Sequence, residues 1–161
     1  MPVSMSRGTI EVAHVVIEST KPFAEVRKAL EASVPTLDAE IGVLLADGLT
    51  DRLRQRLESG AELSIFFTFN HGALLRLYGQ DRQAMQYLIG NPLTASKMTR
   101  YNVAAALYAP LRVVLYETDN GARFEYDLPS SLFGQFGDER ITEVARELDV
   151  SLGRALSAAA G

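Results

Sequence analysis

The residues best suited to chemistry in this chain stand at two corners where an apolar run ends in a turn. The first corner is FNHG, with Asn70, His71 and Gly72, and the second is GNP, with Asn91 before Pro92. Asparagine is a favoured helix N-cap, and the start of a helix presents unpaired N–H groups and a partial positive charge. If the two corners border one cleft, they would favour a carboxylate or another anion there. The simpler interpretation of GNP is a strand-to-helix corner that only turns the chain.

His71 is the candidate for acid–base catalysis. The start of a helix would tend to keep its ring neutral, as a general base requires, but one histidine without a partner motif is no catalytic signature. A binding or structural hydrogen-bonding role for His71 is therefore favoured. His14 lies within a strand-like run and is expected to be a hydrogen-bonded core residue. Two histidines without a spacing motif, in a chain with no cysteine, predict no metal site.

Two side chains of the stretch LRVVLYE extend the candidate site. Arg112 stands among apolar residues, so it would need a buried partner: an internal carboxylate or the anionic group of a ligand. Tyr116 is the tyrosine best placed to point a hydroxyl into a cavity. The candidate ligand-binding residues are therefore His71, Gly72, Asn91, Arg112 and Tyr116, with His71 as the only candidate catalytic residue. No cofactor is expected.

The strands and helices predicted around these residues indicate an α+β fold. Strands are expected at 9–19, 62–69, 84–90, 111–117 and 122–128, and the TDNG sequence between the last two predicts a tight hairpin turn through the positive φ angles of Asn-Gly. Helices are expected after Thr20, Thr50, Asn70, Asn91, Asn102 and Asp138. Within 37–60, EIGVLLADG fits either a short helix or a buried strand. The order β-α-β-α-β-α-β-β-α indicates a mainly antiparallel sheet with helices packed on one face.

The alternation of side chains predicts what the sheet faces meet. In the strand 111–117 the odd positions up to 115 are all apolar, whereas the even positions mix a cation, an aliphatic and an aromatic residue. The second face is too apolar to be merely solvated, which indicates a homodimer contact, a ligand cavity or both. The first strand is apolar at both parities, so we expect it to be covered on both faces.

Composition limits the class of protein. With 161 residues, 47% hydrophobic and no linker, the chain is expected to form a single domain over 1–161. A net charge of −4 argues against nucleic acid as a partner. Neither a secretory signal nor a membrane-spanning run is evident, so a cytoplasmic protein is expected. The sequence contains no Walker, GxGxxG, GxSxG or HExxH motif. It therefore has none of the usual sequence motifs for phosphoryl transfer, dinucleotide binding or classical hydrolysis.

Four stretches, FNHGALLRLYG, YLIGNPLTASKM, AALYAPLRVVLYE and YDLPSS, resemble the DUF302 family, small bacterial and archaeal proteins of undefined function. The resemblance covers about 9–131 and is strongest at 66–129, with the last helix expected at about 138–158. It implies a TBP-like α+β fold and a homodimer. The segment around 37–60 departs from the shortest members. Because fold does not carry function, the resemblance implies no mechanism.

Three hypotheses follow from these residues. The leading one is a homodimeric, non-catalytic binding protein for a small, mostly apolar ligand with an anionic or carbonyl group. The second is a cofactor-independent isomerase or lyase with His71 as general base. The third is a structural or regulatory dimer without a ligand, in which the apolar sheet face is only an interface.

Overall fold

Five strands form the centre of the protein, and the computed structural model describes residues 2–161. The strands are β1 His14–Ser19, β2 Ser64–Asn70, β3 Ala84–Gly90, β4 Leu111–Thr118 and β5 Gly121–Asp127. They make one sheet in the order β1-β5-β4-β3-β2, and every neighbouring pair is antiparallel. The β4–β5 turn falls where the sequence predicts it. Its backbone differs from the prediction, however, because only Gly121 has a positive φ, at 147°.

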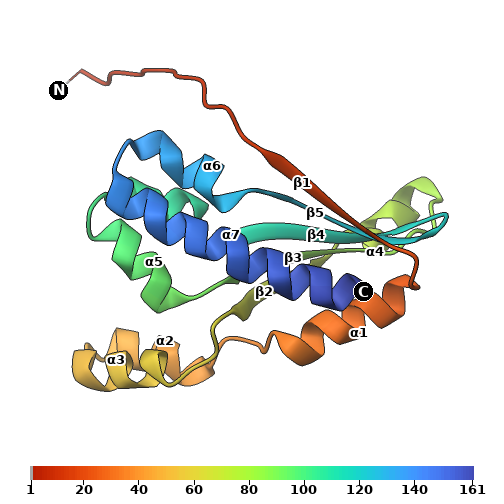
Figure 1. The fold of residues 1–161 in the computed structure, drawn as a ribbon, viewed down its shortest axis with the longest axis horizontal. Coiled ribbons are helices and arrows are strands. Elements are labelled where there is room, and N and C mark those ends of the chain that lie inside the picture. The colour runs from red at the N-terminus through yellow and green to blue at the C-terminus, as the bar shows by residue number, and fades with distance from the viewer. Residues whose placement is uncertain (1) are drawn as a thin grey trace.

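Helices join the strands and cover one face of the sheet (Figure 1). They are α1 Phe23–Ser33, α2 Ala39–Ala46, α3 Thr50–Glu58, α4 His71–Leu75, α5 Pro92–Thr99, α6 Pro129–Phe133 and α7 Glu139–Ala160. Short 3-10 turns lie at Arg76–Tyr78, Val103–Tyr108 and Gly134–Phe136. The predicted α+β class with helices on one face of an antiparallel sheet is confirmed.

The core lies between the sheet and the helices α1 and α7. α7 is amphipathic, and its apolar stripe is buried, with Leu152 and Leu156 at 0% exposure. The sheet contributes Tyr87 and Phe124, which are also fully buried. Burial of each such side chain stabilises the fold by about 1.5–3 kcal/mol. This packing fixes which sheet face is covered and which is left for other contacts.

The segment 37–60, for which the sequence fits two alternatives, is helical. α2 begins after Asp38, whose side chain accepts a hydrogen bond from the N–H of Glu40, and α3 follows directly. Both helices lie beyond the end of β2, beside α5 (Figure 1). Two predicted helix starts need correction: α1 begins after Pro22 rather than at a Thr20 cap, and Thr50 is the first residue of α3 rather than its N-cap.

The first strand differs most from its prediction. β1 begins at His14, the backbone of Ala13 before it still forms hydrogen bonds to Leu128 and Ser131, and residues 2–12 run extended away from the sheet (Figure 1). β1 is covered on one face only, because Val16 is 46% exposed. The prediction of a strand covered on both faces is therefore wrong. Apolar residues at both parities do not distinguish a central strand from an edge strand whose second face is open. Within residues 2–161, none of the helices combines the length and the apolar character needed to cross a membrane.

Candidate functional site

The sheet face opposite the helices holds a shallow hollow of about 440 Å³. The pairing of neighbouring strands places three of its residues side by side: Glu125 of β5 lies opposite Val114 of β4, which lies opposite Gln86 of β3. Side chains of β1, β3, β4 and β5, with one from the start of α4, surround this space. The lining residues are His14, His71, Gln86, Arg112, Val113, Val114, Glu125, Tyr126 and Asp127.

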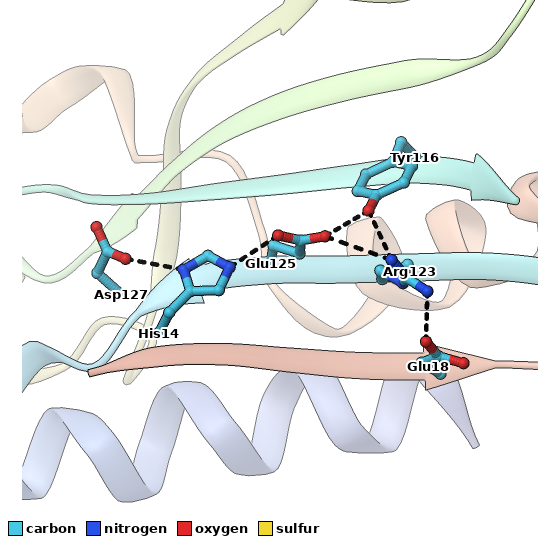
Figure 2. A network of polar contacts seen from close by, with 6 residues as sticks. All are labelled: His14, Glu18, Tyr116, Arg123, Glu125 and Asp127. Carbon is cyan, nitrogen blue, oxygen red and sulfur yellow. Dashed lines mark hydrogen bonds and ion pairs between the residues drawn. The ribbon is translucent and has the colours of Figure 1, made fainter. Parts of the chain in front are cut away.

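Three residues that line the hollow, His14, Glu125 and Asp127, belong to the chain of polar contacts that Figure 2 shows. The His14 ring lies between two carboxylates, with Nδ1 3.0 Å from Asp127 and Nε2 2.7 Å from Glu125. The second oxygen of Glu125 accepts a hydrogen bond from the Tyr116 hydroxyl. Arg123 donates to that same hydroxyl at 3.2 Å and forms an ion pair with Glu18 on β1. The network thus ties β1, β4 and β5 together across the open face.

These contacts set the protonation of the network. Hydrogen bonds to Asp127 and then Glu125 raise the pKa of His14, which favours an imidazolium with both N–H groups engaged. The Tyr116 hydroxyl and then His14 lower the pKa of Glu125. The hydrogen bond to Glu125 is also the main cause that raises the pKa of Tyr116, so the phenol stays neutral. The His14 ring, the Glu125 carboxylate and the Tyr116 hydroxyl therefore form one coupled polar network.

The sequence prediction for His14 is wrong. His14 is not a core residue, because its side chain is 52% exposed on the open face. The sequence also predicts that Tyr116 points its hydroxyl into a cavity, but that hydroxyl is bonded to Glu125. The first difference arises from the register of β1 with β5, which places His14 opposite Asp127, and the second from the pairing of β4 with β5, which brings Tyr116 near Glu125. Sequence alternation identifies the side chains of one face but does not align one strand with another.

Arg112 and His71 lie on the other side of the hollow. His71 Nε2 is 3.3 Å from Gln86 Oε1, and its ring packs edge-on against Phe69 with centroids 4.9 Å apart. Arg112 is exposed, so the alternative of a buried internal carboxylate is wrong, and the alternative of a ligand's anionic group stays a prediction. Among residues 2–161, neither a side-chain hydrogen bond nor an ion pair holds its guanidinium. Arg112 is therefore available to a ligand in the hollow.

The two corners named by the sequence do not share a cleft. β2 and β3 are antiparallel, with Asn70 opposite Met85 and Ser64 opposite Gly90, so the strand ends that lead into α4 and α5 lie at opposite ends of the sheet. The one-cleft hypothesis is therefore wrong. Both asparagines do cap helices: the Asn70 oxygen accepts from the N–H of Ala73 at 3.0 Å.

Asn91 is fully engaged within the fold. Its oxygen accepts from the N–H groups of Leu93 and Thr94, and its amide nitrogen donates to the carbonyls of Ala61 and Glu62. These bonds anchor the start of α5 to the loop before β2. Because the capped N–H groups are already satisfied, this corner offers no anion site through Asn91.

Gly72 also has a structural explanation. A Cβ at this position would lie 2.6 Å from the carbonyl oxygen of Arg82 and 2.8 Å from the nitrogen of Ala84. Glycine therefore lets α4 approach the start of β3, which brings His71 beside Gln86. The close approach inferred from the sequence is to the protein's own backbone.

Sequence reasoning does not find the polar network. Its acidic residues, Glu125 and Asp127, alternate with buried residues along β5, which signals a solvated sheet face but no partner for His14. Only the pairing of β1 with β5 brings the three side chains together. Among residues 2–161, no group of three histidine or acidic side chains has the arrangement needed to hold a metal ion.

Comparison with known proteins identifies the family of this chain. Residues 46–159 match the family described as "Domain of unknown function DUF302". The chain belongs to the DUF302 family. The match begins and ends later than the 9–131 expected from the sequence: it leaves out residues 9–45 and includes nearly all of α7. In the DUF302 chain, α7 is therefore part of the family domain.

A solved structure supports the fold of this DUF302 chain. It is described as the crystal structure of an uncharacterized conserved protein DUF302 from Bacillus stearothermophilus. The likeness has a TM-score of 0.66 at 16% identity and covers 91% of this chain and 97% of that chain. At this identity the likeness shows a shared fold. No curated protein gives a significant match.

Proposed function

We propose that this DUF302 chain is a binding domain for a small ligand with an anionic or carbonyl group, held in the hollow on the open sheet face. The proposal rests on one observation: Arg112 is an exposed cation that lines the hollow, and no side chain among residues 2–161 forms a hydrogen bond or ion pair with its guanidinium. An arginine presents several N–H donors in a planar fork that suits a carboxylate or phosphate. The other cation of the hollow, His14, already meets two carboxylates.

The surroundings of Arg112 favour a ligand of mixed polarity. His71 and Gln86 supply hydrogen-bonding groups, and Val114, which lies opposite Gln86 in the sheet, supplies an apolar floor. Glu125 and Asp127 repel anions less than bare carboxylates would, because His14 lies between them. The polar end of the ligand is therefore placed at Arg112, and its apolar body over Val114.

Catalysis by His71 receives less support from the geometry. Its ring partner is the neutral amide of Gln86, which orients the imidazole but accepts no proton. The other histidine of the hollow is favoured as a cation. We therefore propose binding without turnover.

The test compares Arg112→Gln with Arg54→Gln, a matched change at an exposed arginine of α3 that lies outside the hollow. Acetate, benzoate and inorganic phosphate are titrated into the ¹⁵N-labelled protein, and dissociation constants are obtained from amide shifts near Val114. A hydrogen bond to a charged group contributes about 1.5–3 kcal/mol, so Arg112→Gln weakens binding by about 10- to 150-fold. Arg54→Gln leaves binding unchanged.

Native mass spectrometry on freshly purified protein gives an independent reading. A mass excess that disappears on denaturation would identify a retained ligand and supply its mass. The proposal fails if none of the three anions binds near Val114 and no excess mass is present, or if the two arginine variants bind equally.

A second candidate is a homodimer contact on the same sheet face. Phe67 and Phe69 of β2 are 51% and 40% exposed, and Val16 of β1 is 46% exposed, which leaves apolar surface on both sides of the hollow. Phe67→Ser should lower the sedimentation coefficient of a dimer, whereas Val103→Ser, at a 79% exposed position elsewhere, should not. A wild-type monomer at all concentrations would rule out this contact.

A further inference from the structure

A second, separate cavity opens at the GNP corner. Its volume is about 270 Å³, and it lies on the opposite side of the sheet from the hollow that contains Arg112. The two sides are distinguished along β4: Leu111 is buried and lines this cavity, whereas its neighbour Arg112 is exposed and lines the hollow. Consecutive residues of a strand point to opposite faces, so the two spaces are independent.

The cavity walls are apolar, and five elements contribute large apolar side chains to them. Phe66 of β2, Met98 of α5, Leu111 of β4, Phe133 of α6 and Leu148 of α7 meet around it. None of the residues that line the cavity carries a charge. A charged ligand would lose its hydration here without gaining a counter-ion, which is strongly unfavourable.

The polar groups of the cavity are largely satisfied by the fold. Asn91 caps α5 and anchors the loop before β2, and the Ser96 hydroxyl donates to the carbonyl of Leu93. Two threonine side chains, Thr94 and Thr99, complete the polar part of the lining. The cavity can therefore offer a ligand few hydrogen bonds but a large apolar surface.

Close packing and hydrogen bonds define the frame of the cavity. Gly90 lies close to the segment that leads into β4: a Cβ added to Gly90 would be 3.3 Å from the Cβ of Pro110. The hydrogen bonds of Asn91 fix the first turn of α5 on the other side. The sheet and the cap thus set the backbone around the cavity, as is usual for ligand sites, which are largely preformed.

We propose that this cavity is a ligand site for a small uncharged molecule with an aromatic or branched hydrocarbon body and at most one or two hydrogen-bonding groups. A water molecule occupies about 30 Å³ of liquid, so the cavity corresponds to about nine waters. Release of poorly held water from apolar walls supplies the affinity, and the absence of charge excludes anions. This inference does not depend on the function proposed for the open sheet face.

The probe for the test is N-phenyl-1-naphthylamine, a neutral aromatic compound whose fluorescence increases in apolar surroundings. Binding is located by NMR of protein labelled with ¹³C at the methionine methyl groups. Met98 lines the cavity and is 1% exposed, whereas Met85 is a buried core residue of β3 outside the cavity. We expect saturable fluorescence and a shift of the Met98 methyl signal, with that of Met85 unchanged.

Two matched variants sharpen the test. Ala95→Phe places a ring at the cavity wall and should weaken probe binding by at least 10-fold. Ala158→Phe makes the same change at an exposed position of α7, away from the cavity, and should leave binding unchanged. Arg112→Gln should also have no effect on this probe, which separates the two sites.

The proposal is overturned if the wild-type protein shows no saturable binding, or if the probe shifts Met85 and leaves Met98 in place. Equal affinity in Ala95→Phe and Ala158→Phe would overturn it as well. If Ala95→Phe fails to fold, as judged by collapse of the Met85 signal, the wild-type methionine shifts alone decide.

Discussion

Replacement of Gly72 by alanine tests whether this glycine is required by packing. Gly72 lies in α4, directly after His71, and is buried against the chain that enters β3. The added methyl group would lie 2.6 Å from the oxygen of Arg82 and 2.8 Å from the nitrogen of Ala84. Both neighbours are backbone atoms, so no side-chain rotation can relieve the overlap. α4 must move away from β3.

The magnitude follows from two opposing effects. Overpacking of this kind destabilises the folded protein by about 1–3 kcal/mol. In the opposite direction, alanine has less conformational freedom than glycine in the unfolded chain, which stabilises the folded protein by about 0.4–1 kcal/mol. Gly72→Ala should therefore lower the free energy of unfolding by about 1–2 kcal/mol. With a urea dependence of about 2 kcal/mol/M, the unfolding midpoint falls by about 0.5–1 M.

Gly42→Ala is the matched control. Gly42 lies within α2, and an added Cβ there meets no atom within 4 Å. Alanine is favoured over glycine inside a helix by about 0.5–1 kcal/mol, so this variant should raise the urea midpoint. The same glycine-to-alanine substitution is thus expected to lower the urea midpoint at Gly72 and to raise it at Gly42. A midpoint for Gly72→Ala equal to or above that of the wild-type protein would refute the packing argument.

Two further predictions concern the polar contacts. The raised pKa of His14 means that its network stabilises the folded protein fully below the ordinary pKa of 6.5 and progressively less as the pH rises through the raised value. The difference in urea midpoint between wild type and His14→Gln should therefore shrink from pH 6 to pH 9, and a pH-independent difference would contradict the pairing. Tyr87 is fully buried, and its hydroxyl donates to Glu31 at 2.9 Å. Tyr87→Phe should cost about 0.5–1.5 kcal/mol of stability, measured by thermal and urea unfolding. The control is Tyr78→Phe at an 80% exposed position, and an equal effect of the two changes would exclude a stabilising role for the Tyr87–Glu31 hydrogen bond.

Local sequence signals predict most of the fold. The alternation along β4 and β5, the Asn-Gly turn position and the apolar stripe of α7 each act over a few residues, so they are readable without the rest of the chain. The caps at Asn70 and Asn91 are predictable for the same reason, because an asparagine bonds to N–H groups only two or three residues ahead. The motifs around these two caps also carry the resemblance to the DUF302 family, to which the chain belongs.

The candidate site depends on contacts between distant segments. His14 and Asp127 are 113 residues apart, and only the register of β1 on β5 places their side chains together. The direction of β3 relative to β2 likewise decides that His71 and Asn91 lie at opposite ends of the sheet.

The sequence by itself therefore determined most of the elements, the asparagine caps and the alternation of faces along β4 and β5, because these arise from interactions between near neighbours. The tertiary structure alone decided that Arg112 faces a hollow and Leu111 a separate cavity. Strand register and helix packing are set by the whole core at once, and no short stretch of the chain encodes them.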